Sequence, residues 1–114
     1  MTTIHGIANC DTMKRARAWL EARDVTATFH DYKKQGVDEA KLRDWTKALG
    51  WEKVLNRVGT TFRKLPEADR AQLDGEKAVT MLLAYPSMIK RPMVEYAGGL
   101  LIAFREDEWE KALL

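Results

Sequence analysis

The sequence predicts an α/β fold in which helices cover a central mixed sheet. The first observation is a strand, helix and strand in the first thirty or so residues. The second is a strand, hairpin and helix at the C-terminal end, after a helical middle. The third is the hydrophobic content, which at 46% of 114 residues suffices for one core. We therefore expect a single domain over 1–114, with a helical insertion at about 37–85.

The first part of the sheet is predicted from alternation and helical spacing. Thr3–Ile7 alternates apolar and polar residues as a half-buried strand does, and residues 8–12 form a polar turn. Three- and four-residue spacing then predicts a helix, whose inward side chains are Met13, Ala16, Leu20 and Trp19. A second strand is expected over 25–32, with Val25 and Phe29 inward. This order predicts parallel strands joined by a right-handed crossover.

The middle of the chain reads as helical. Asp38 is a plausible N-cap, apolar residues at positions 42, 45 and 49 line one face, and Gly50 ends the helix. Further helices are predicted at 51–55, 66–73 and 76–85, with a polar loop at 56–61 and another loop at 87–92. The chain then closes with a strand at 93–96, a turn at 97–99, a return strand at 100–104 and a helix at 107–114.

Composition excludes several classes of function. Nineteen basic and 17 acidic residues leave a net charge of +2, which argues against a direct nucleic-acid binder. No run approaches the ~18 apolar residues of a membrane span. The N-terminus lacks the pattern of a signal peptide, so we expect a cytoplasmic protein whose thiol stays reduced. With one cysteine and two histidines, no metal-ligand spacing is present.

Cys10 is the candidate nucleophile. It falls in the first turn of the predicted helix, where the backbone N–H groups of Asp11, Thr12 and Met13 lack helical partners. Those donors and the helix dipole favour a thiolate, and Lys14 adds positive charge one turn on. The alternative is a small buried hydrophobe, as free cysteines often are. Because Met13 stands where a CxxC motif has its second cysteine, any redox cycle needs a thiol from outside the chain.

Three arginines are candidates for binding an anion: Arg57, Arg63 and Arg91. Arginine binds oxyanions and carboxylates through two parallel hydrogen bonds, although most arginines are solvated surface residues. The Arg91–Pro92 bond precedes a predicted strand and could be cis, while a trans bond is far commoner. His5 and His30, both within predicted strands, are conceivable bases, with a packing role as the simpler interpretation.

Three segments in order resemble the arsenate reductase ArsC family, and within it the YffB branch and, more distantly, the Spx regulators. The segments are IANCDTMKRA at 7–16, NRVGTTFRKL at 56–65 and IKRPM at 89–93. The resemblance covers nearly the whole chain and implies a thioredoxin-like fold with a helical insertion. It matches Cys10 to the family's nucleophile, Arg57 and Arg91 to its anion-binding arginines, and Pro92 to its cis-proline.

The chain also departs from the family pattern. The third arginine of the arsenate reductases aligns with Phe104; Arg105 is one place off and, by strand alternation, would point to the other face. The lead-in to the nucleophile is Gly6-Ile7-Ala8 instead of the family's His-Asn-Pro.

The resemblance implies a monothiol reductase that uses glutathione as co-substrate, with no bound cofactor. The alternatives are an arsenate reductase served by glutathione and glutaredoxin, and an Spx-like regulator that binds RNA polymerase. The expected substrate is a small oxyanion or a thiol adduct. We expect the protein to be a monomer that does not bind membranes. The expected site contains Cys10, with Asp11, Thr12, Lys14, Arg57 and Arg91 binding the substrate.

Overall fold

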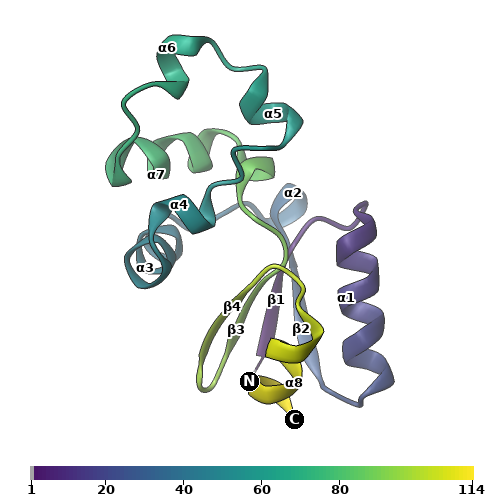
Figure 1. The fold of residues 1–114 in the computed structure, drawn as a ribbon. Coiled ribbons are helices and arrows are strands. Elements are labelled where there is room, and N and C mark those ends of the chain that lie inside the picture. The colour runs from purple at the N-terminus through teal and green to yellow at the C-terminus, as the bar shows by residue number, and fades with distance from the viewer. Residues whose placement is uncertain (1) are drawn as a thin grey trace. The chain divides into compact units, whose positions relative to one another are not determined.

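The computed structural model describes residues 2–114 and divides the chain into two compact units (Figure 1). One unit contains the chain up to Gln35 together with Arg91–Leu114, and it holds the sheet. The other is Gly36–Lys90 and is built from helices. That residues 1–114 act as one domain stays a prediction.

The sheet has four strands in the order β2-β1-β3-β4. They are β1 (Thr2–Gly6), β2 (Ala27–Asp31), β3 (Met93–Tyr96) and β4 (Gly99–Ile102). β1 pairs with β2 in parallel, whereas β1–β3 and β3–β4 are antiparallel. The predicted mixed sheet and its parallel βαβ start are therefore confirmed.

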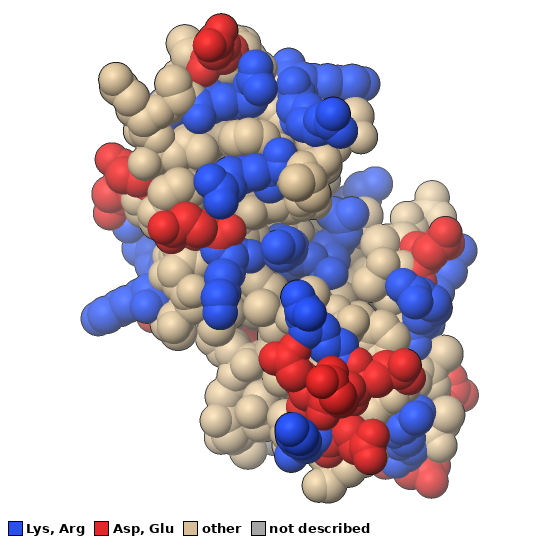
Figure 2. All heavy atoms as spheres, in the orientation of Figure 1, with Lys and Arg blue, Asp and Glu red and all other residues tan. Residues whose placement is uncertain are grey.

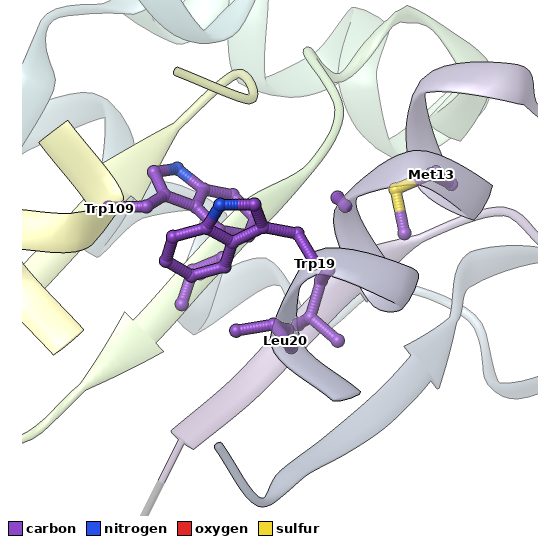
Figure 3. Close-up of a cluster of buried hydrophobic side chains, with 7 residues drawn as sticks. Met13, Trp19, Leu20 and Trp109 are labelled. Atoms are coloured by element: carbon purple, nitrogen blue, oxygen red, sulfur yellow. The ribbon is translucent and has the colours of Figure 1, made fainter. Parts of the chain in front are cut away.

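Helices α1 (Asp11–Ala22) and α8 (Glu106–Leu113) contribute to the core of this unit. The four inward positions predicted for α1 are all buried. The core cluster, drawn in Figure 3, consists of Ile4, Met13, Ala16, Trp19, Leu20, Val94 and Trp109. Ile4 and Val94 pair across β1 and β3, so strand alternation directs His5 and Glu95 to the opposite face. The Trp19 and Trp109 rings meet edge to face at 5.8 Å.

Two predicted strands in this unit are too long. The strand predicted through residue 32 ends at Asp31, and Tyr32 begins the short helix α2 (Tyr32–Gln35). The return strand predicted through residue 104 ends at Ile102, because Ala103 takes a left-handed φ of 63° that strands do not accommodate. Phe104 therefore lies outside the strand, and the alternation argument for Arg105 does not apply.

The helical unit comprises α3 (Glu39–Leu49), α4 (Trp51–Val54), α5 (Thr60–Arg63), α6 (Glu67–Arg70), α7 (Gly75–Ala84) and the 3₁₀ helix η1 (Pro86–Met88). The predicted Asp38 cap is present, since its Oδ1 accepts a hydrogen bond from the Ala40 N–H at 3.1 Å. Gly50 ends α3 with a φ of 90°. Leu42 and Trp45 are buried as predicted, and Leu49 is half-buried.

Three local predictions in the helical unit are wrong. Residues 60 and 61, expected in a loop, begin α5, and Pro86–Met88 forms the 3₁₀ helix where part of a loop was expected. The helix expected over 66–73 shrinks to α6, because Ala71 is extended with a ψ of 154°, and Gln72 beyond it takes a φ of 50°. Asp74 then caps α7 by accepting the Lys77 N–H at 2.8 Å.

Charged side chains of both signs are spread over the face shown in Figure 2. Acidic side chains gather there over α8, whose first turn contains Glu106, Asp107 and Glu108. Carboxylates in a first turn interact favourably with the helix dipole, so this cluster suits the start of α8. None of the helices in the described part of the chain has both the length and the apolar character needed to cross a bilayer.

Candidate functional site

Three segments distant in sequence meet at one edge of the sheet. Gly6 and Asp31 are paired at the carboxyl ends of the parallel strands β1 and β2. The antiparallel strand β3 starts at the same edge, because its first residue, Met93, pairs with His5. Cys10, Tyr32 and Arg91 follow or precede these strand ends by a few residues. Ligands of open α/β sheets bind at such an edge.

Cys10 is the N-cap residue of α1. Its backbone is extended, with φ −148° and ψ 126°, and its carbonyl oxygen accepts the Lys14 N–H at 2.9 Å. The side chain is half-buried and packs against the core cluster, while the neighbouring Asn9 and Asp11 are exposed. The side chain is therefore neither fully buried in the core nor freely solvated, and the reactivity of the thiol stays a prediction.

The surroundings of Cys10 favour its thiolate. Burial of the thiol raises the pKa of Cys10, but hydrogen bonds and charge acting together lower it below its ordinary value. The pKa is lowered by the backbone N–H of Met13, by hydrogen bonding and the positive charge of the Arg91 side chain, and by the backbone N–H of Thr12. These are the N-terminal donors of a helix and a guanidinium, which together lower cysteine pKa values in proteins.

Arg91 is half-buried and begins the segment that returns to the sheet. The Arg91–Pro92 peptide bond is cis, and Pro92 is buried. The Pro92 carbonyl oxygen accepts the Ala103 N–H at 2.9 Å, which ties the segment to the end of β4. The guanidinium that donates to Cys10 thus projects from a backbone that the sheet holds in place.

The other predicted site residues are placed in different ways. Thr12 is half-buried, and its backbone N–H helps to lower the pKa of Cys10. Asp11 and Lys14 are exposed on the first turns of α1. Arg57 belongs to the helical unit, where its guanidinium lies 5.6 Å from the centroid of the Trp51 ring. Contact of Asp11, Lys14 or Arg57 with a ligand at Cys10 stays a prediction.

The face of the sheet opposite the core cluster carries a cluster of aromatic and polar side chains that the sequence did not predict. His5 is buried, and its Nε2 lies 2.7 Å from Glu95 Oε1. The His5 ring lies 5.1 Å from His30 and 6.2 Å from Tyr32, measured between centroids. Neither Glu95 nor Tyr32 was a candidate. The paired positions of His5 and His30 were recognisable once two parallel strands were predicted, but the position of Glu95 depends on the register of β3.

The position of the third family arginine is filled differently. Phe104 packs edge to face against Trp109 at 4.9 Å and against Trp19 at 6.3 Å. Arg105 is exposed, and its Nε lies 3.3 Å from Glu108 Oε2 on α8. Within residues 2–114, no group of three or more histidine, cysteine, aspartate or glutamate side chains is arranged to hold a metal ion.

Comparisons with known proteins identify relatives in sequence and in fold. The sequence model of the ArsC family matches residues 5–112. The solved structure of a protein named YffB is 51% identical and superposes with a TM-score of 0.97, with 100% of both chains covered. An arsenate reductase (ArsC) related protein from Brucella melitensis is also 51% identical, with a TM-score of 0.79 over 96% of this chain and 92% of that one. The global transcriptional regulator Spx of Streptococcus mutans is 28% identical over 111 residues, which are 95% of this chain and 80% of that protein.

Proposed function

The chain belongs to the ArsC family, and from this membership and the setting of Cys10 we propose that it is a glutathione-dependent monothiol reductase. The observation that carries the proposal is the setting of the Cys10 sulfur, whose pKa is lowered, against the effect of burial, by Arg91 and by two backbone amides in the first turn of α1. A thiolate is the reactive form of cysteine in nucleophilic and redox chemistry.

The reaction proceeds in two exchanges. The Cys10 thiolate attacks one sulfur of a disulfide substrate, a Cys10 mixed disulfide forms, and the other sulfur leaves as a thiolate that takes a proton from water. A glutathione thiolate then attacks the mixed disulfide and releases Cys10 as the thiolate. With a mixed disulfide of glutathione as substrate, Cys10 attacks the glutathione sulfur, so the products are one substrate thiol and one glutathione disulfide, and one glutathione thiol is consumed. Because the chain has one cysteine, the second thiol comes from outside.

The remaining residues bind the anionic parts of the substrate in this proposal. Arg91 contacts both the sulfur and a carboxylate or oxyanion, because a guanidinium can donate several hydrogen bonds at once. The Thr12 N–H contributes a fixed dipole beside the sulfur. Lys14 and Arg57 supply further positive charge, and Asp11 stabilises the start of α1 as a first-turn carboxylate.

A regulatory function is the second candidate, because the S. mutans relative is named a global transcriptional regulator. Binding of RNA polymerase would not require the Cys10 thiolate. Arsenate reduction is less well supported, since Phe104 fills the position of the third arginine and Arg105 pairs with Glu108 instead.

The test is a glutathione-coupled turnover assay with a mixed disulfide of glutathione as substrate, run on the wild type and on Cys10→Ser. The wild type should turn over and Cys10→Ser should not. Substitution of the exposed Lys64, which lies in the helical unit, serves as the control. Absence of wild-type turnover would refute the reductase. RNA polymerase captured equally by wild type and Cys10→Ala would then support the regulator.

A further inference from the structure

The hydroxyl of Tyr32 is a buried polar group that the proposed reaction has not used. Tyr32 is only 3% exposed, and its hydroxyl has no hydrogen-bond partner among residues 2–114. Buried hydroxyls are nearly always paired, so an unpaired one requires an explanation, and a bound ligand supplies one. By contrast, Tyr85 is 45% exposed and can be solvated.

Tyr32 lies at the sheet edge that carries Cys10 and Arg91. It directly follows Asp31, the residue opposite Gly6 at the end of the parallel pair. The positive charge of Arg91 acts on the phenol, so the guanidinium that donates to the Cys10 sulfur is also within electrostatic range of the Tyr32 hydroxyl.

The orientation of the Tyr32 ring is fixed by its neighbours. The ring is stacked on His5 at 6.2 Å with an interplanar angle of 20°, and it meets His30 at 6.1 Å and 64°. His5 is itself held by the 2.7 Å hydrogen bond to Glu95. A donor fixed in this way loses little entropy when it binds a ligand.

The phenol is a donor and not a base. Burial raises the pKa of Tyr32, the charge of Glu95 raises it further, and the opposing effect of Arg91 is smaller, so the hydroxyl stays protonated at neutral pH. A protonated hydroxyl beside a guanidinium suits an anionic oxygen, to which hydrogen bonds are stronger than to a neutral one.

We propose that Tyr32 is a binding residue of the Cys10 site, whose hydroxyl donates a hydrogen bond to an anionic oxygen of the substrate that Arg91 also contacts. The inference rests on the proposed function and adds substrate specificity to it: the site selects disulfides that carry a carboxylate near the reacting sulfur. Arg91 attracts the anionic oxygen by its charge, and the Tyr32 hydroxyl fixes the position of that oxygen through a directional hydrogen bond.

The test compares two disulfides in a single exchange with Cys10. Glutathione disulfide carries carboxylates, whereas bis(2-hydroxyethyl) disulfide carries no charge. The rate of mixed-disulfide formation is followed by intact-protein mass spectrometry for the wild type, Tyr32→Phe and the control Tyr85→Phe. Tyr32→Phe should slow the exchange with glutathione disulfide about tenfold or more, the effect of losing a hydrogen bond to a charged group. It should leave the exchange with the neutral disulfide unchanged, and Tyr85→Phe should change neither.

Equal slowing of both exchanges by a folded Tyr32→Phe, or slowing of neither, would overturn the inference. If Tyr32→Phe does not fold, fluorine NMR of fluorotyrosine-labelled wild type gives a second readout. The Tyr32 resonance should then move when Cys10 carries a glutathionyl group and stay in place when it carries the hydroxyethyl group; the same shift in both adducts would also refute the role. Failure of the proposed reductase function can be distinguished from failure of this inference, because formation of the Cys10 mixed disulfide is a single exchange that does not require catalytic turnover.

Discussion

The guanidinium of Arg91 donates a hydrogen bond to the sulfur of Cys10, although the two residues lie near opposite ends of the sequence. The antiparallel pairing of β1 with β3 accounts for their proximity, because it places the residues after β1 and those before β3 at one edge. The consequence is chemical: a permanent positive charge stabilises the thiolate next to the amides of α1.

Arg91→Ala should raise the pKa of Cys10. It removes both the side-chain hydrogen bond and the charge that favour the thiolate, and leaves the Met13 and Thr12 amides in place. The ultraviolet absorbance of the thiolate during a pH titration measures the change. Arg105→Ala is the matched control, since it removes an exposed arginine of the same unit that pairs with Glu108. Equal pKa values in the wild type and Arg91→Ala would refute the contact.

The thiolate should also contribute to stability at alkaline pH. The folded-state pKa of Cys10 lies below its ordinary value, so the folded chain loses the proton at lower pH than the unfolded chain does. The contribution is complete above the unfolded pKa and is lost as the pH falls through the folded pKa. In urea unfolding under reducing conditions, the free energy of unfolding of the wild type relative to Cys10→Ser should increase as the pH rises from below the folded-state pKa of Cys10 to above the unfolded-state pKa. A constant difference would contradict the pKa shift.

Gly6→Ala should disturb the site through packing. A Cβ at Gly6 would lie 2.6 Å from Met13 Cε and would also clash with the Met13 sulfur. Met13 is fully buried and its backbone N–H helps to lower the pKa of Cys10, so displacement of Met13 weakens this effect. We expect a loss of about 1–3 kcal/mol in the free energy of unfolding, together with slower alkylation of Cys10 at neutral pH. Thermal denaturation and alkylation rates measure the two effects.

A matched substitution makes the Gly6 prediction specific. Gly36→Ala places its Cβ in open space, although its φ of 73° strains the new side chain. It should therefore lower stability without changing the reactivity of Cys10. If Gly36→Ala slows alkylation as much as Gly6→Ala does, the effect comes from general destabilisation.

Arg57→Ala tests the predicted anion-binding role of the helical unit. If Arg57 contacts a substrate carboxylate, its loss should raise the KM for a glutathione-containing substrate about tenfold, the effect of a hydrogen bond between charged groups. The pKa of Cys10 should stay the same, because Arg57 is not among the groups that shift it. Steady-state kinetics measure this KM, and Arg70→Ala, which removes another exposed arginine of the helical unit, is the control. An unchanged KM would remove Arg57 from the site.

Local patterns in the sequence predicted those elements whose determinants are local. The spacing of Met13, Ala16 and Leu20 gave the buried face of α1, and Asp38 with Gly50 gave the limits of α3. Two of the errors occurred at or next to a residue that adopts a positive φ. Ala103 ends β4 early and Gln72 lies within the helix expected over 66–73, and neither residue type signals such a conformation.

The residues of the candidate site likewise include some that a local sequence pattern predicts and some that it does not. Cys10 and its amide donors follow from one helix start, so they could be predicted from a short segment. The pairing of Arg91 with Cys10 came from the family resemblance, since no local pattern connects the two. The Tyr32 and Glu95 side chains were missed because their meeting with His5 depends on the registers of both neighbouring strands.

The pH dependence of Cys10 alkylation tests the central claim most directly. The single cysteine of the chain makes the iodoacetamide reaction rate a report on one thiol. If Cys10 is activated, the alkylation rate should rise with pH and reach its midpoint below about pH 8.5, the pKa of a free cysteine. A midpoint at or above that value would contradict an activated Cys10.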